Sequence, residues 1–437
     1  MYEKPTINLI DYSTLGKYGS SIKPHKVKDA IDGVSVHDLT KEYGSPLFVF
    51  SRTDIERKYE QFYEAFSSRY PDVSFWWSYK TNYLDAICKV FHELGSRAEV
   101  VSEFEYQKAR ALGIEGKDII FNGPYKPKDA LKVAVEEGAK IHIDHWYEIN
   151  DLEDIAKELG RTVDVAIRVN MNTGVYPLWS RFGFNYENGE AIEAIERIKI
   201  GGLLNLTGLH THIGTFMLSA DAYRVAATKL MLLRREAKQK FGFNVEYIDM
   251  GGGFASKNRL KGVYQSPDVV VPSADEYAQA ITEAIYENAD GNLPKLYLET
   301  GRALIDEAGY LLTSVVASKR MADGKKSYIL DAGVNILYTS TWYNFDLFLD
   351  KRYKGLSEPV QLNGPLCMNI DIVEENVVLP PLERGSILTL WPVGAYNVTQ
   401  WMQFIRYRPA VVLIENGTPR LIREAEDLAY VKEKERG

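Results

Sequence analysis

The sequence is poor in cysteine and lacks both long apolar runs and long basic runs. Two cysteines, Cys88 and Cys367, are too few for a disulfide framework, which fits a reducing cytoplasm. No uncharged apolar stretch approaches the roughly 20 residues of a membrane helix, and no basic region followed by an apolar stretch marks a signal peptide at the start. A net charge of -8 argues against nucleic acid. We therefore expect a cytoplasmic protein with no membrane or nucleic-acid partner.

The 437 residues are enough for two domains of ordinary size. In the middle of the chain, short β-rich runs alternate with helical periodicities. Eight such units over about 230 residues predict a (β/α)8 barrel of the TIM type, whose usual size is ~250 residues. A doubly wound open sheet is the alternative. The predicted strands are 74–80, 98–102, 119–123, 140–144, 163–170, 206–214, 245–251 and 295–301, and the predicted helices are 83–94, 103–112, 127–137, 146–158, 188–198, 220–241 and 273–288.

After Arg302 the pattern changes to strands joined by turn-rich loops with few helices. These strands are predicted at 310–321, 326–331, 360–363, 386–391, 404–415 and 419–424. We expect the barrel to occupy residues 47–303, with 47–51 starting it or contributing to it. Residues 1–46 and 304–437 are expected to form a second, mostly β domain that completes the active site.

Lys80 closes a short, apolar, aromatic run at residues 74–80. A lysine at the end of a buried strand is costly unless a partner satisfies its charge or a lowered pKa makes it neutral. Lysines in such settings serve as Schiff-base nucleophiles toward carbonyl groups, including the aldehyde of pyridoxal phosphate. A lysine that extends from a strand end into solvent is the simpler interpretation. Whether Lys80 is a Schiff-base lysine therefore has to be judged from the other residues at strand ends.

Four further features at predicted strand ends supply what a pyridoxal phosphate site needs. Glu299 would keep the pyridine nitrogen protonated, so that the ring accepts the electrons left by a departing group. The glycines 251–253 would let backbone N–H groups approach a phosphate. Arg302 would add a charge-assisted contact to phosphate or a carboxylate, and His212 would stack on the ring. Taken alone, the glycines are more simply explained as a tight turn and His212 as a histidine with satisfied hydrogen bonds. Glu299 and Arg302 are more simply explained as a surface ion pair.

A metal-dependent barrel hydrolase is a different reading of the same region. His210 and His212 form an H-x-H pair at a strand end, and this spacing puts both imidazoles on one face, where they can bind zinc. His142 and His145 lie at another strand end, and the three glycines have no role in that chemistry. Full activity in a metal-free preparation would exclude this reading.

The motifs resemble those of the alanine-racemase-fold (fold type III) pyridoxal phosphate decarboxylases, the family of diaminopimelate and ornithine decarboxylases. The similarity extends from about residue 40 to about residue 415. Its matching segments are Tyr79-Lys80-Thr81-Asn82, His210-Thr211-His212-Ile213-Gly214-Thr215, Asp249-Met250-Gly251-Gly252-Gly253-Phe254, Glu299-Thr300-Gly301-Arg302, Gly364-Pro365-Leu366-Cys367, Gly394-Ala395-Tyr396 and Ser180-Arg181-Phe182-Gly183.

The resemblance implies a barrel with a C-terminal β-barrel or β-sandwich domain, and a homodimer that releases CO2 from the α-carbon of an amino acid. It implies that Lys80 forms the Schiff base with pyridoxal 5'-phosphate and that Cys367, contributed by the second subunit, delivers a proton after CO2 leaves. The other implied cofactor residues are His212, Thr215, Gly252, Gly253, Glu299, Thr300, Gly301, Arg302 and Tyr396; the implied substrate residues are Arg302, Tyr343, Met368 and Tyr396; no metal is expected.

Two positions depart from the family pattern. Met368 follows Cys367 where family members carry the Glu or Asp that holds the distal ammonium of the substrate. Thr339 and Ser340 stand where an Arg-Pro pair grips the distal carboxylate of diaminopimelate. Losing a charged partner for a desolvated substrate charge costs several kcal/mol, on the order of 2–5. We therefore expect a substrate other than diaminopimelate.

Three functions remain open on the sequence, of which decarboxylation is the one we predict. A racemase or epimerase on the same fold places an arginine at the pyridine nitrogen, whereas this chain has Glu299. A non-catalytic cofactor carrier resembles the barrel alone, whereas this chain has a second domain bearing Cys367 and Tyr396. Glu299 and Cys367 together favour a lyase that acts on an amino acid.

Overall fold

The computed structural model describes residues 26–437. Two expectations about the start of the chain, the lack of a signal peptide and the packing of residues 1–25 with the second domain, lie outside the described residues.

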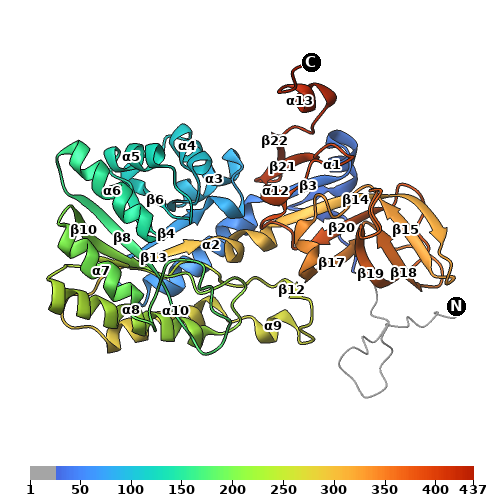
Figure 1. Ribbon diagram of the computed structural model, residues 1–437. Helices are drawn as coiled ribbons and strands as arrows, with labels where there is room; N and C mark the ends of the chain where they lie inside the picture. The colour runs from blue at the N-terminus through green and yellow to red at the C-terminus, as the bar shows by residue number, and fades with distance from the viewer. Residues whose placement is uncertain (1–25) are drawn as a thin grey trace.

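A closed barrel of parallel strands forms one half of the molecule, on the left in Figure 1. In residues 26–437, eight strands pair in the order β10-β11-β13-β4-β5-β6-β7-β8, and β8 pairs with β10 to close the ring. Closure confirms the (β/α)8 prediction over the open sheet. The strands are β4 (Val73–Ser78), β5 (Arg97–Val100), β6 (Ile119–Phe121), β7 (Lys140–Ile143), β8 (Val163–Asn170), β10 (Leu204–His210), β11 (Tyr247–Asp249) and β13 (Lys295–Thr300).

Helices cover the outside of the barrel, each with one apolar face turned inward. They are α2 (Arg52–Ser67), α3 (Asp85–Glu93), α4 (Glu103–Ala111), α5 (Lys128–Glu136), α6 (Trp146–Leu159), α7 (Glu190–Gly201), α8 (Ala220–Phe241) and α10 (Ala274–Glu287). In α8 the buried Ala222, Ala226 and Leu230 recur every four residues, which is the spacing of one helix face. Ser273 and Glu276 form a capping box that begins α10. No helix within residues 26–437 is long and apolar enough to cross a bilayer.

The second half, on the right in Figure 1, is a mixed sheet that branches at the long strand β14 (Gly309–Arg320). The first part of β14 pairs with both β3 and β20, and its last part pairs with β15. This arrangement confirms an additional, mostly β domain. Its other strands are β3 (Leu47–Ser51), β15 (Lys326–Leu330), β17 (Asp346–Leu349), β18 (Glu358–Asn363), β19 (Ile372–Leu379), β20 (Ile387–Trp391), β21 (Ala410–Glu415) and β22 (Thr418–Arg423).

The strand β3 lies in the second sheet, which corrects the expectation that residues 47–51 start the barrel. It pairs antiparallel with β14 and parallel with β21. All five of its residues are buried and the first four are apolar, a pattern that fits the centre of either sheet. The hydrophobic pattern alone therefore could not assign β3 to the barrel or to the second sheet. We propose that the domains divide just after β3 and again near α11 (Arg302–Ile305).

The second domain reaches back to the barrel mouth beside Lys80. The backbone N–H of Tyr396 donates to the carbonyl of Thr81 at 2.9 Å. The hydroxyl of Thr399 donates to the carbonyl of Lys80, also at 2.9 Å. The turn that carries Lys80 is therefore fixed from both domains.

Candidate active site

The predicted site residues converge at the carboxyl ends of the barrel strands, the face where barrels of this kind place their chemistry. Lys80 lies in a short 3-10 turn, η2 (Tyr79–Thr81), directly after β4. Glu299 lies in β13, the strand that pairs with β4. Both side chains line a cavity of about 220 Å³, whose other lining residues are Glu99, Val101, Asn122, Gly123, Pro124, Arg168, Trp179, Phe182, His210 and His212.

Lys80 is held by a buried carboxylate. Its Nζ lies 3.0 Å from both oxygens of Glu99, which is fully buried. Burial alone would lower the pKa of Lys80, but Glu99, with Glu299 and Tyr396, raises it above the ordinary value. Lys80 is thus a protonated amine in this structure, and its partner, rather than a lowered pKa, explains how a lysine is tolerated here.

An amide connects the two carboxylates of the cavity. The side-chain nitrogen of Asn122 donates to Oε1 of Glu99 at 3.1 Å and also to Oε1 of Glu299. Burial raises the pKa of Glu99 despite the nearby Lys80. Lys80, Glu99, Asn122 and Glu299 therefore form one continuous hydrogen-bonded row across the barrel mouth.

His212 is neutral and its orientation is fixed. Burial, followed by the charge of Lys80, holds its pKa well below the ordinary value. Its Nδ1 accepts a hydrogen bond from the backbone N–H of Gly252 at 3.1 Å, which leaves the proton on Nε2. The indole of Trp179 lies beside it, with ring centroids 5.8 Å apart. A neutral, flat imidazole at this place suits the predicted stacking role.

The glycine turn after β11 leaves no room for side chains. A Cβ on Gly251, Gly252 or Gly253 would meet a backbone carbonyl, in the last case that of Gly214. Gly251 and Gly253 also have φ of +65° and +91°, which side chains rarely allow. The N–H groups of Gly251 and Gly252 already donate to Asp249 and His212, so of the three glycines Gly253 is the one whose N–H is left for an anion.

We expect Gly253→Ala to lose about 1–3 kcal/mol of stability, because the new methyl forces backbone apart in a well-packed turn. Cofactor affinity should fall with it. Urea unfolding and cofactor titration measure the two effects. The matched control is Gly262→Ala, where φ is +83° but nothing lies within 4 Å of the added carbon. Equal losses of cofactor affinity in both variants would contradict the role of the turn.

Arg302 is packed between aromatic rings from both domains. Its guanidinium carbon lies 4.8 Å from the ring centroids of Tyr343 and Tyr396 and 5.6 Å from that of Phe216. Its Nε and Nη1 have no hydrogen-bond partner among the described residues, although Nη1 lies 3.6 Å from Asp306. The arginine thus has unused donors and a fixed plane, as expected for binding an anion.

Three predicted residues are not brought to Lys80 within this chain. Thr215 is exposed on the loop after β10. Cys367 is exposed and Met368 half-buried on a loop of the second sheet. Asp371 shapes that loop by accepting hydrogen bonds from the backbone N–H of Val334 and of Leu366. Neither Cys367 nor Met368 lines the cavity of Lys80.

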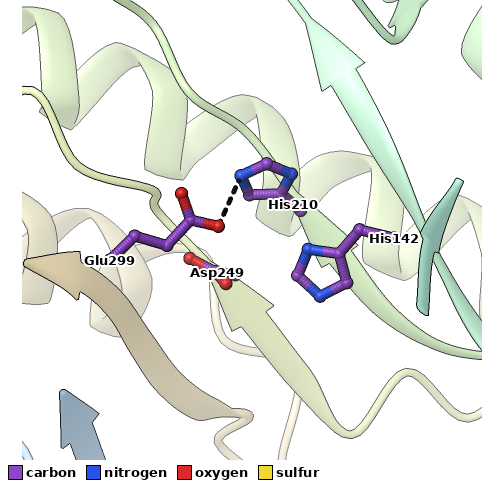
Figure 2. Close-up of side chains that lie close together, drawn as sticks. All are labelled: His142, His210, Asp249 and Glu299. Atoms are coloured by element: carbon purple, nitrogen blue, oxygen red, sulfur yellow. Dashed lines mark ion pairs between the residues drawn. The ribbon is translucent and has the colours of Figure 1, made fainter. Parts of the chain in front are cut away.

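Four buried side chains lie close enough together for a metal ion: His142, His210, Asp249 and Glu299, whose ligand atoms all lie within 4.8 Å of one another (Figure 2). His212 is outside this group, so the H-x-H pair of the hydrolase reading is divided. Nε2 of His210 instead lies 3.1 Å from Oε1 of Glu299.

Glu99 and Asn122 were not predicted as site residues. Glu99 stands in β5 between the apolar, buried Ala98 and Val100, and a carboxylate at such a position is the signal that could have identified it. Asn122 follows β6 in a Gly/Pro-containing loop and carries no comparable signal.

The residues present fit an anionic aromatic cofactor with an aldehyde. The cavity offers one amine, Lys80, which is paired with Glu99, and a second carboxylate, Glu299, on the neighbouring strand β13. The glycine turn forms a cradle, and Thr300 Oγ1 is buried without a hydrogen-bond partner among the described residues. These groups match the aldehyde, pyridine nitrogen and phosphate of pyridoxal phosphate.

Comparison with known proteins agrees with this geometry. Residues 52–306 match the family model described as "Pyridoxal-dependent decarboxylase, pyridoxal binding domain". The chain is 30% identical over 423 residues to a diaminopimelate decarboxylase of Methanocaldococcus jannaschii, covering 92% of this chain and 94% of that protein. It is 31% identical over 421 residues to that of Aquifex aeolicus, with the same coverage. A crystal structure of the M. jannaschii enzyme has a TM-score of 0.86 at 29% identity, covering 94% of this chain and 98% of that one.

Proposed function

Because this chain belongs to the pyridoxal-dependent decarboxylases, we propose that it releases CO2 from the α-carbon of an amino acid other than diaminopimelate. Lys80, in the turn after β4, and Glu299, on the neighbouring strand β13, line one cavity and carry the decarboxylase part of this proposal. A racemase of this fold places an arginine where this chain has Glu299, so the carboxylate favours loss of CO2 over racemisation.

Each residue has a definable task. Bound pyridoxal phosphate supplies an electron sink for the bond that breaks. Lys80 would hold the cofactor through its amine, and Glu99 pairs with that amine when no cofactor is attached. Glu299 would hold a proton on the pyridine nitrogen. The glycine turn and Arg302 would bind the anionic oxygens of cofactor and substrate with donors that are already in place. These donors would therefore not have to move during the reaction.

A second copy of the chain completes the site in this proposal. Cys367 is exposed on the second domain, and neither it nor Met368 lines the cavity of Lys80. The family resemblance assigns the cysteine to the partner's active site, where it returns a proton to the α-carbon. An exposed loop held rigid by Asp371 suits this role, because it reaches the partner without first having to become ordered.

The residues of this loop region support a substrate without the distal charges of diaminopimelate. Met368 lines a cavity of about 690 Å³ in the second domain, together with Tyr338 and Ile370. Thr339 is buried, and both its N–H and its hydroxyl donate to the side-chain oxygen of Asn397. It therefore offers no free group to a distal carboxylate. The charged residues lining this cavity are Lys261, Glu374 and Glu375.

The test is CO2 release from a panel of amino acids with pyridoxal phosphate added: diaminopimelate, lysine, ornithine, arginine, glutamate and aromatic and apolar members. We expect the highest kcat/KM for an amino acid without a distal ammonium. We also expect Met368→Glu to raise kcat/KM for lysine or diaminopimelate by about tenfold or more, because it restores a partner for a desolvated ammonium.

The outcomes separate the parts of the proposal. Suppose that CO2 is released from diaminopimelate or lysine alone and that Met368→Glu does not raise kcat/KM for either. This result would overturn the substrate assignment but not the assignment of the reaction as a decarboxylation. The control Met402→Glu places the same charge at a half-exposed methionine lining the same cavity and should give a smaller gain. No CO2 from any substrate, with exchange of the α-proton in heavy water, would make the enzyme a racemase.

A further inference from the structure

A layer of four buried polar side chains adjoins the cavity of Lys80, and the proposed reaction gives a task only to Glu299. The layer consists of His142 on β7, His210 on β10, Asp249 on β11 and Glu299 on β13, all drawn in Figure 2. Each offers one ligand atom, and these atoms all lie within 4.8 Å of one another. A barrel core is ordinarily filled with branched apolar residues, so two imidazoles and two carboxyl groups in one layer need an explanation.

Three of these side chains hold polar atoms that have no hydrogen-bond partner within residues 26–437. The atoms are Nδ1 of His142, both ring nitrogens of His210 and Oδ2 of Asp249. None of the three residues is more than 1% exposed. Buried polar atoms without a partner are costly and rare in folded proteins. A cation bound among them would give each side chain a partner.

The other atoms of these side chains are already held in place. Nε2 of His142 lies 3.1 Å from the hydroxyl of Tyr247, which leaves Nδ1 free. Oδ1 of Asp249 accepts a hydrogen bond from the backbone N–H of Gly251 at 2.8 Å, which leaves Oδ2 free. Histidines and carboxylates that bind metals typically have a second partner of this kind, which fixes the orientation of the ligand.

The distances suit a cation of the zinc class. Ligand atoms that surround a tetrahedral zinc at about 2.1 Å lie about 3.4 Å from one another. Nε2 of His210 and Oε1 of Glu299 are 3.1 Å apart without forming a hydrogen bond. Because no pair of ligand atoms exceeds 4.8 Å, shifts of roughly an ångström would bring all four to zinc. Imidazole nitrogens and carboxylate oxygens are ligands that zinc accepts.

The charges of the layer also match a divalent cation. Two carboxylates buried side by side repel each other, whereas two carboxylates and two neutral imidazoles around a divalent ion form a neutral unit. The nearby cationic side chains already have other partners. Lys80 is paired with Glu99 at 3.0 Å, and Arg168 lies 3.4 Å from Asp144. They therefore leave the charge of Asp249 and Glu299 to another cation.

We propose that His142, His210, Asp249 and Glu299 form a binding site for a divalent cation of the zinc class, a site that the family resemblance does not imply. Four protein ligands leave no open position for a substrate, so the site is closed and not catalytic. His210 and Glu299 line the cavity of Lys80, so the ion enters through the barrel mouth while no cofactor is bound.

The ion and the cofactor compete for Glu299. The proposed function assigns this carboxylate to the pyridine nitrogen, and only this consequence rests on the proposed function. Because coupling between two ligands is reciprocal, zinc weakens the binding of pyridoxal phosphate by the same factor as pyridoxal phosphate weakens the binding of zinc. The site therefore makes zinc an inhibitor of cofactor loading.

The first measurement is the zinc affinity of the full chain before pyridoxal phosphate is added, obtained by competition with a chelating dye. We expect His142→Asn, which removes a ligand, to weaken zinc binding by at least about 100-fold. Tyr247→Phe removes the group that orients His142 and should weaken it by about tenfold or more. The matched control is His145→Asn, at the same strand end but outside the group and 3.8 Å from Glu148. It should bind zinc as the wild type does.

The second measurement is the amount of pyridoxal phosphate that the chain retains when zinc is added first, followed by visible absorbance. Zinc should weaken cofactor binding in the wild type by about 5- to 150-fold, the usual range of coupling between two ligands. Removal of zinc with EDTA should restore it. His142→Asn should retain the same amount of cofactor with and without zinc.

Three results would overturn the proposal: no zinc bound by the wild type, equal zinc affinity in the wild type and His142→Asn, or zinc bound elsewhere. Anomalous scattering at the zinc edge locates the ion in crystals, and a peak at His37, which pairs with Asp350, would be the third result. If His142→Asn does not fold, Tyr247→Phe makes the comparison. Zinc binding needs neither substrate nor cofactor, so this test decides the site even if the CO2 assay fails.

Discussion

Replacing Lys80 with alanine should lower kcat/KM by at least about 10³-fold, the scale of removing a group that handles bonds and protons directly. The amine is the only one lining the cavity within the described residues, so no neighbour can take its place. The variant should also fail to retain cofactor after borohydride reduction and denaturation, which mass spectrometry detects. Retention of more than about a tenth of the activity would contradict the assignment.

Two variants separate chemistry from stability in this experiment. Lys80→Ala leaves Glu99 buried without its cation, which destabilises the fold by itself. Lys80→Arg keeps a cation for Glu99 but has no amine that forms a Schiff base, so it should fold better than the alanine variant and be equally inactive. Lys58→Met is the matched control, because Lys58 is also buried with a carboxylate, Glu307 at 2.9 Å. It should lose stability and keep its kcat.

The barrel could be predicted because its local patterns and its architecture agree. The predicted helix at 220–241 coincides with α8, and the strand at 163–170 coincides with β8. Boundaries were less well predicted where polar residues end a strand. Lys80 was expected as the last strand residue but lies in the 3-10 turn η2. The strand β19 was missed because its segment includes Glu374 and Glu375, which hide the apolar pattern.

Site residues were predictable only where they belong to a sequence motif. The lysine, the glycines and Glu299 stand in short recognisable segments, and they converge because parallel strands end on one face. Asn122 acts through contacts with strands distant in sequence, and such contacts leave no mark on local spacing, whereas Glu99 is marked only as a carboxylate between apolar residues of a strand. Cys367 shows the reverse case, since its motif was clear but its own chain does not bring it to Lys80.

Changing Glu299 to glutamine should lower kcat/KM by about 10²- to 10³-fold, the scale of losing one preorganised electrostatic contact. Glutamine keeps the shape and the hydrogen bond from Asn122, but it carries no charge to hold a proton on the pyridine nitrogen. The electron sink is then weaker at the step that breaks the carbon–carbon bond. Steady-state CO2 release measures the loss, and KM should change much less than kcat.

Asp249→Asn is the control that tests whether Glu299 or Asp249 carries the negative charge needed for activity. Burial raises the pKa of Asp249 well above its ordinary value, which favours the neutral carboxyl in the folded protein. Asparagine retains the acceptor for the N–H of Gly251 and should keep kcat/KM within about tenfold. It should also stabilise the protein increasingly as the pH rises above the ordinary aspartate range, because only the unfolded wild-type chain releases this proton there. A larger loss of activity in Asp249→Asn than in Glu299→Gln would place the working charge on Asp249.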